Sequence, residues 1–142
     1  MNLGEELFVD ADVVIPAAQQ DVLDGDDVMN LKGKVLVEGA NLPTNKKAQK
    51  ILNERGVTVI PDFIANAGAV VGAGVAMDAR YSAFRPDANA ILALISEKMR
   101  ANARAVVEAA RRDVVTTHEA ATFLCQKRVR AAMELKGRLR QR

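Results

Sequence analysis

The chain has 142 residues, enough for one domain with a buried core, and 49% of them are apolar while 27% are charged. This balance excludes a disordered chain, and a single cysteine excludes an internal disulfide framework. No apolar run approaches the roughly 18 residues of a membrane span, and no signal-like basic and apolar segment follows Met1. We therefore expect a soluble, cytoplasmic protein without a membrane partner.

The net charge of +2 is unevenly distributed. Residues 1–44 hold nine acids and two bases, whereas residues 45–142 hold nine acids and eighteen bases. Residues 127–142 alone hold seven bases and one acid, Glu134. Because apolar residues separate these bases at helical spacing and no aromatic residue lies among them, we predict a solvated helix end. A partner surface is the alternative, and no nucleic-acid partner is expected.

Three short segments have the pattern of buried parallel strands. Residues 13–15 are a continuous apolar run that Pro16 ends. Residues 34–41 contain four strand-like residues followed by a glycine turn, and residues 57–62 repeat the form. Continuous apolar runs are typical of strands covered on both faces.

A helical pattern lies between the second and third strand segments. Thr44 or Asn45 can cap its start, and Gly56 can end it. Its apolar face consists of Ala48, Ile51 and Leu52. A strand, a helix and a strand in this order form a βαβ unit, in which both strands run parallel. The pattern therefore predicts an α/β fold with an open parallel sheet.

The chain after Asp62 has helical patterns. Residues 63–81 carry small residues at helical spacing, which predicts a helix that can approach another backbone closely. A long helix is predicted from Pro86, with Asp87 near its start. Its apolar positions are Ile91, Leu92, Leu94, Ile95, Met99, Ala103, Val106, Val107 and Ala110.

The last predicted helix begins with a capping box, formed by Thr116 and Glu119. This helix extends to about Leu135, and Gly137 is its predicted stop.

Each predicted strand ends in a turn of small or polar residues, at residues 16–18, 38–41 and 61–62. Ligands of parallel α/β sheets bind beyond the carboxyl ends of the strands. Small residues let a planar ring or a ribose approach the backbone, and Asn41 and Asn66 can donate and accept hydrogen bonds. One such turn needs no ligand to explain it, but three in register favour a ligand crevice.

One glycine-containing segment resembles a phosphate-binding turn but departs from its pattern. Gly72 and Gly74 match the first two positions of GxGxxG, whereas Met77 holds the third. The segment also lies inside a helical pattern and not on a strand-to-helix turn. We interpret residues 70–77 as a helix-packing segment.

The sequence predicts no catalytic residue and no metal site. His118 is interpreted as a surface histidine and Cys125 as a core thiol, and no metal-ligand spacing is present. Asp24, Asp26 and Asp27 lack the twelve-residue loop and closing glutamate of a calcium site, so we predict a solvated loop.

Three segments together closely resemble successive blocks of the glutamate/leucine/phenylalanine/valine dehydrogenases. They are ADVVIPAA at residues 11–18, VEGANLPTNKKAQKILNERGVTVIPD at residues 37–62 and IANAGAVV at residues 64–71. The family's cofactor domain carries an EGAN-P-T block and a PD-x-x-x-NAGG block in this order. The resemblance implies a partial Rossmann-like parallel sheet with flanking helices, followed by C-terminal helices. Within a single domain, 1–142, it implies a partial dinucleotide-binding α/β part at 1–62 and a helical part at 63–142.

The resemblance also implies a crevice for NAD or NADP. Its lining would consist of Ala17, Ala18, Gly39, Ala40, Asn41 and Asn66. Ala17 and Ala18 would border the ribose and nicotinamide side, and Asn66 would approach the nicotinamide and the substrate. The implied reaction is the reversible oxidative deamination of an L-amino acid to a 2-oxo acid and ammonia, with the hydride passing to the cofactor.

The chain departs from the family pattern at two positions. Ala69 stands where NAGG has its second glycine, and Ala73 stands at a substrate-binding position where glutamate-specific members usually carry serine. The resemblance therefore supports no substrate subclass.

The family's GxGxxG turn and its lysine-bearing substrate domain would precede Met1. We therefore expect the C-terminal cofactor-domain portion of an amino-acid dehydrogenase, inactive alone. Its expected partners are further copies of the chain or the missing N-terminal part. The alternative is a non-catalytic binding or assembly module derived from that family.

Overall fold

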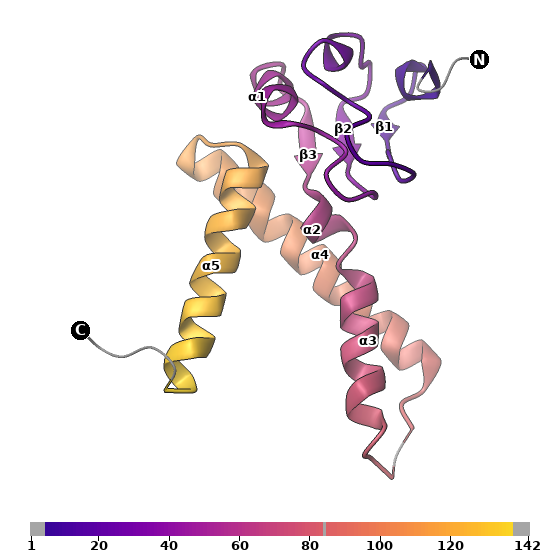
Figure 1. The fold of residues 1–142 in the computed structure, drawn as a ribbon, viewed down its shortest axis with the longest axis vertical. Helices are drawn as coiled ribbons and strands as arrows, with labels where there is room; N and C mark the ends of the chain where they lie inside the picture. Colours follow the sequence, from indigo (N-terminus) through magenta and orange to yellow (C-terminus); the bar gives the residue numbers. More distant parts are fainter. Residues whose placement is uncertain (1–4, 84, 138–142) are drawn as a thin grey trace.

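The computed structural model describes residues 5–83 and 85–137. Figure 1 shows a small α/β part at one end, followed by one helix that leads away from it, one that runs back and one that leads away again. The solvated helix end predicted for residues 127–142 includes residues 138–142, which lie outside the described residues. No helix in the two described ranges has both the length and the apolar character needed to cross a membrane.

The sheet contains three parallel strands in the order β1-β2-β3. They are β1 (Val13–Val14), β2 (Val35–Val37) and β3 (Thr58–Ile60). Leu36 at the centre of the sheet pairs with Val14 on one side and Val59 on the other, and all three are buried. This confirms the predicted parallel α/β architecture, and it places the carboxyl ends of all three strands along one edge.

Helix α1 (Lys46–Glu54) connects β2 to β3. Asn45, and not Thr44, is its N-cap, since Asn45 Oδ1 accepts a hydrogen bond from the backbone N–H of Ala48 at 2.9 Å. Gly56 follows the helix with a φ of 73°, as predicted for its stop. Ala48 and Leu52 are fully buried against the sheet core.

The core of the α/β part also includes the segment before β2. This segment contains the 3-10 turn η2 (Asp27–Met29), and a first 3-10 turn, η1 (Glu5–Phe8), lies at the start of the described chain. The Arg55 guanidinium donates hydrogen bonds to the carbonyls of Val28 and Leu31, the latter at 2.7 Å. These bonds hold the η2 segment against the end of α1. The buried core residues are Val14, Leu23, Val28, Leu31, Leu36, Ala48, Leu52 and Val59.

The region predicted as one helix over residues 63–81 is two helices, so that prediction was wrong. A short helix, α2 (Asp62–Ala65), ends at Asn66, and α3 (Gly68–Ala79) begins two residues later. Two glycines of α3 approach side chains of the next helix and not its backbone, so the close backbone approach stays a prediction. A Cβ built on Gly68 would lie 3.0 Å from Cγ2 of Ile95. None of the residues of α3 is buried.

The last two helices form a hairpin, α4 (Ala88–Asp113) and α5 (Thr117–Leu135) (Figure 1). Asp87 caps α4 by accepting from the N–H of Ala90 at 3.1 Å. The predicted capping box at the start of α5 is present with both of its hydrogen bonds. A small core that includes Ile64, Val106 and Ala121 joins α2 to the hairpin.

Candidate functional site

The turns that follow the three strands are joined at the carboxyl edge of the sheet. The backbone N–H of Ala40 donates to the carbonyl of Pro16 at 2.9 Å, which connects the turns after β2 and β1. The N–H of Glu38 donates to the carbonyl of Ile60 at 3.0 Å, which connects the ends of β2 and β3. The three turns therefore form one continuous surface.

This surface surrounds an open hollow of about 520 Å³. It is lined by Ala17, Ala18, Gln19, Gln20, Gly39, Ala40, Asn41, Asn66 and Val70. The structure thus brings together all six residues that the resemblance assigned to a cofactor crevice. The two glutamines and Val70 were not predicted. The glutamines directly follow Ala17 and Ala18 in the turn after β1, and this adjacency is the signal in the sequence that could have indicated them.

Glycine at position 39 fits the closeness of the first two turns. A Cβ built there would lie 3.0 Å from the Cβ of Ala17 and 3.4 Å from its Cα. Contacts of 3.0–3.4 Å are tighter than those of ordinary Cβ atoms, and the neighbour here includes backbone. Small residues on both turns therefore set the width of the hollow at this point.

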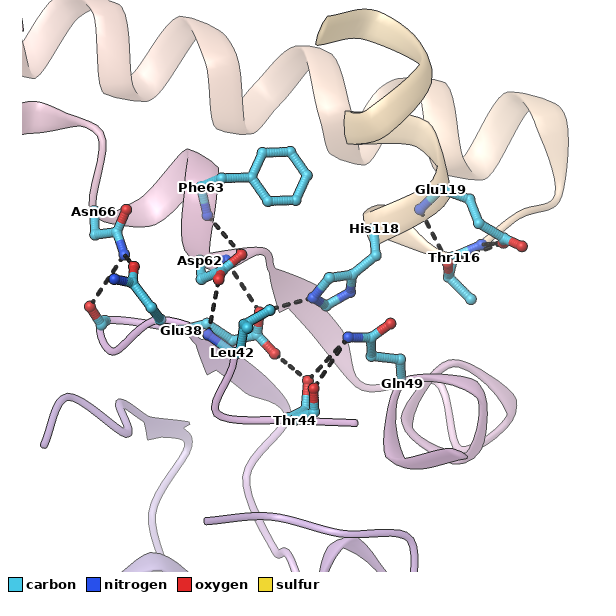
Figure 2. Close-up of polar contacts among 12 residues, drawn as sticks. Glu38, Leu42, Thr44, Gln49, Asp62, Phe63, Asn66, Thr116, His118 and Glu119 are labelled. Atoms are coloured by element: carbon cyan, nitrogen blue, oxygen red, sulfur yellow. Dashed lines mark hydrogen bonds and ion pairs between the residues drawn. The ribbon is translucent and has the colours of Figure 1, made fainter. Parts of the chain in front are cut away.

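Asn66 connects the third turn to the second. Its side-chain Nδ2 donates to Oδ1 of Asn41 at 2.7 Å and approaches the carbonyl of Gly39 at 3.5 Å (Figure 2). Asn66 is the C-cap of α2, and α3 begins two residues later, so this side chain lies at the break between the two helices.

The turn after β2 contains a backbone conformation that non-glycine residues seldom adopt. Leu42 has a φ of 50°, and its side chain is exposed. Its N–H donates to Oδ2 of Asp62 at 2.8 Å, and its carbonyl accepts from the N–H of Asp21 at 2.9 Å. Two hydrogen bonds from separate segments hold this conformation in place.

Beneath the turns lies a buried carboxyl group that the sequence analysis did not single out. Glu38 is 1% exposed, and its carboxylate accepts from the Thr44 hydroxyl, from the N–H of Asp62 at 3.0 Å, and from the His118 ring (Figure 2). Oε2 of Glu38 lies 2.7 Å from Nε2 of His118. The sequence carried a signal for this position. Glu38 lies two residues after Leu36, so strand alternation places both on the same covered face.

The prediction that His118 is a surface histidine was wrong. Its side chain is 13% exposed and points from the first turn of α5 toward Glu38 (Figure 2). The two residues are 80 positions apart in the chain, so no local pattern around His118 indicates the contact. Helix α5 is brought to the sheet edge by the core that includes Ile64 and Ala121.

Glu38, Asp62 and His118 place one possible metal-ligand atom each within 4.8 Å of one another. Their polar atoms already have partners within the protein. Asp62 accepts from the N–H groups of Leu42 and Phe63, and Glu38 accepts from three donors. No buried side-chain nitrogen or oxygen in residues 5–83 and 85–137 is without a hydrogen bond. The arrangement is complete as a hydrogen-bond network, and the sequence-based expectation of no metal site stays a prediction.

The remaining residues singled out by sequence lie away from the hollow. Ala73 is on an exposed part of α3 and does not line it, and Gly72 and Gly74 are inside the same helix, as interpreted. Cys125 is half-buried beside the core that joins α2 to the hairpin. The nearby bases of α5 are exposed.

The aspartate cluster is a self-capped turn. Oδ1 of Asp24 accepts from the N–H groups of Asp26 at 2.7 Å and Asp27 at 3.0 Å. The bond from the N–H of Asp27, followed by that from Asp26, holds the pKa of the Asp24 carboxyl below its ordinary value. Lys47 contacts Asp26 at 3.0 Å, which raises the pKa of the lysine. The exposed carboxylates of Asp24 and Asp26 agree with the solvated loop that was predicted.

Comparison with known proteins gives a family match over almost the whole chain. The family model of glutamate/leucine/phenylalanine/valine dehydrogenase matches residues 2–137. A glutamate dehydrogenase of Aeropyrum pernix is 33% identical over 138 residues, which are 94% of this chain and 33% of that protein. An NADP-specific glutamate dehydrogenase of Saccharolobus shibatae is 47% identical over 73 residues, 51% of this chain and 17% of that protein. The chain thus spans about a third or less of these relatives.

Solved structures share the fold. The hetero-hexameric glutamate dehydrogenase of Thermus thermophilus in its leucine-bound form matches with a TM-score of 0.82 at 23% identity. The match covers 94% of this chain and 32% of that one. The arrangement of a parallel sheet followed by C-terminal helices is therefore that of known proteins.

Proposed function

The chain belongs to the glutamate/leucine/phenylalanine/valine dehydrogenase family, and we propose that it is the C-terminal cofactor-domain portion of an amino-acid dehydrogenase similar to glutamate dehydrogenase. In the complete enzyme the reaction is the reversible oxidative deamination of an L-amino acid, coupled to NAD or NADP. The chain contributes part of the cofactor site and is inactive alone.

One observation carries this proposal. The hollow of about 520 Å³ lies beyond the carboxyl ends of three parallel strands, where α/β sheets bind nucleotides. Its alanines and Gly39 leave room for a flat ring or a ribose, and the amides of Asn41 and Asn66 offer donors and acceptors. We assign Ala17, Ala18, Gly39, Ala40, Asn41 and Asn66 to the cofactor.

The proposed inactivity of the chain alone has a physical basis. A pyrophosphate is normally held where a glycine-rich strand-to-helix turn presents N–H groups at a helix N-terminus, and this sequence contains no GxGxxG. The partner that completes the site is a polypeptide bearing that turn and the lysines of the substrate domain. Further copies of the complete protein form the homo-oligomer, and the setting is cytoplasmic.

The substrate is proposed only as an L-amino acid. Ala73 replaces the serine that glutamate-specific members usually carry at the matching position, and the side chain of Ala73 is exposed and apolar. The residues of this chain therefore favour no particular amino acid.

The test combines calorimetry with an activity assay. The purified chain is titrated with NAD+ and NADP+, and it is assayed with glutamate, leucine and phenylalanine. We expect no turnover by the chain alone and dinucleotide binding no tighter than about 0.1 mM, which is roughly −5.5 kcal/mol. Turnover by the isolated chain would contradict the proposal that it is an incomplete site. Failure of both dinucleotides to bind, even after a GxGxxG-bearing N-terminal part is supplied, would reject a cofactor role.

The second candidate function is a non-catalytic binding or assembly module, which the surface of α3 favours. This helix buries none of its residues, and Val70 and Met77 are 73% and 65% exposed. Val70 and Met77 are seven residues apart and so lie on one face of the helix, and contiguous exposed apolar surface is typical of contact sites. Sedimentation of the chain and of a Val70→Glu, Met77→Glu variant would test it. Association that the two changes abolish, together with an absence of dinucleotide binding by the unchanged chain even when a GxGxxG-bearing N-terminal part is supplied, would favour the module over the enzyme portion.

A further inference from the structure

The buried Glu38 carboxylate connects three segments that are distant in sequence. It accepts from Thr44 just before α1, from the backbone of Asp62 at the start of α2, and from His118 in the first turn of α5. The contact joins Oε2 of Glu38 and Nε2 of His118 at 2.7 Å, and with Glu38 as a carboxylate, which only accepts hydrogen bonds, His118 is the donor. A buried carboxylate is stable only with such partners.

The same network reaches the turn that borders the hollow. Glu38 directly precedes Gly39, whose backbone lies on the hollow surface. The backbone N–H of Asp62 donates to the Glu38 carboxylate, and the Asp62 carboxylate accepts from the N–H of Leu42 at 2.8 Å. Two carboxylates therefore fix the turn of residues 39–42 (Figure 2). Glu38 is held just before its start, and Asp62 binds the N–H of Leu42 at its end.

His118 is the contact between this network and the helical hairpin. Among the hydrogen bonds of the described residues, it is the side chain by which α5 reaches Glu38. An apolar cluster that includes Ile60, Ala121 and Leu124 also joins α5 to the end of β3. Apolar contacts allow small shifts, whereas a hydrogen bond of 2.7 Å fixes one distance.

We propose that Glu38 and His118 are positioning residues, which set the shape of the cofactor turn at residues 39–42 from the first turn of α5. The consequence for nucleotide affinity rests on the proposed function, but the positioning itself does not. In this arrangement the Glu38–His118 contact couples the orientation of the α4–α5 hairpin to the shape of the hollow.

The test of positioning uses the ligand-free chain and backbone amide NMR. His118→Ala removes the donor, and His118→Gln retains an amide donor that can reach the same carboxylate. We expect His118→Ala to shift the amide signals of Gly39, Ala40 and Asn41, and His118→Gln to restore them close to their original positions. Gln126→Ala, a change of an exposed residue on the same helix, is the matched control and should leave these signals unchanged.

Glu38→Gln gives an independent arm, with the exposed Glu134→Gln as its control. Should Glu38→Gln not fold, the two His118 variants still decide the question. Turn signals that stay unchanged in a folded His118→Ala chain would overturn the proposal. So would equal shifts in His118→Ala and His118→Gln, because the effect would then come from loss of the ring and not of the hydrogen bond.

A second readout separates this inference from the proposed function. NAD+ and NADP+ affinities are measured for the chain, with the N-terminal part supplied if the chain alone binds neither. We expect about tenfold weaker binding for His118→Ala, or 1.4 kcal/mol, and near-normal binding for His118→Gln. Perturbed turn signals without any dinucleotide binding would reject the cofactor role and leave positioning supported. Unperturbed signals with normal binding would reject positioning and leave the cofactor role supported.

Discussion

Nδ2 of Asn66 lies 2.7 Å from Oδ1 of Asn41, so the C-cap residue of α2 holds a side chain of the turn after β2. The same Nδ2 approaches the carbonyl of Gly39 at 3.5 Å. Two amides that both line the hollow are thereby fixed relative to each other before any ligand arrives. Such fixed groups bind with a smaller loss of conformational entropy.

Asn66→Ala is predicted to weaken dinucleotide binding more than folding. The change removes both a side chain of the hollow and the bond that orients Asn41. We expect affinity to fall about tenfold, or 1.4 kcal/mol, and the free energy of unfolding to fall by less than about 1 kcal/mol, because the bond is near the surface. Calorimetry and urea unfolding measure the two effects. Asn53→Ala, an exposed residue near the end of α1, is the control, and equal losses in both variants would contradict the prediction.

Gly39→Ala is predicted to destabilise the chain, whereas Gly74→Ala is not. The added Cβ at position 39 meets Ala17 at 3.0 Å, while at position 74 it meets nothing within 4 Å. Overpacking of this kind costs about 1–3 kcal/mol. Alanine in an exposed helix interior instead stabilises by about 0.5–1 kcal/mol relative to glycine. Thermal and urea unfolding of the two variants should therefore move in opposite directions, and stabilisation of both would show that the first two turns are not tightly packed.

The parallel sheet, α1 and the caps of α4 and α5 were predictable because their signals are local. Asn45, Asp87 and the Thr116–Glu119 pair act within three residues of the helix starts that they cap. The meeting of the turns after the three strands was also predictable, since strands that run parallel bring their carboxyl ends to one edge, whereas the set of six hollow residues came from the family resemblance.

The break after α2 and the Glu38–His118 contact were missed for different reasons. Alanine, glycine and valine at helical spacing do not reveal that Asn66 leaves the helix to bond with Asn41, because that bond depends on tertiary structure. The position of His118 depends on how the α4–α5 hairpin packs against the sheet edge, and His118 lies 80 residues from Glu38 in the chain. The long apolar pattern of α4 also overstated its burial, since Leu92 is 63% exposed.

Arg55→Ala is predicted to loosen the segment that contains η2. The guanidinium donates to the carbonyls of Val28 and Leu31, which would otherwise lack this partner beside a buried core. A hydrogen bond from a charged group contributes about 1.5–3 kcal/mol. We expect a loss in that range by urea unfolding, with faster amide hydrogen exchange at residues 27–31. Arg104→Ala, at an exposed position of α4, is the matched control, and similar losses in both would show that removal of charge alone is responsible.

The contribution of Glu119 to stability is predicted to be lost in acid. Its carboxylate accepts from the N–H and the hydroxyl of Thr116, both at 2.9 Å, and the backbone bond is the larger cause of its lowered pKa. A carboxyl with a pKa below its unfolded value of 4.5 stabilises the fold fully above pH 4.5 and loses this contribution as the pH falls through the lowered value. The difference in unfolding free energy between the wild type and Glu119→Gln should therefore be constant near neutral pH and shrink in acid. Glu97→Gln, at an exposed position of α4, should show a difference that hardly changes with pH, and a Glu119 difference that grows in acid would contradict the capping role.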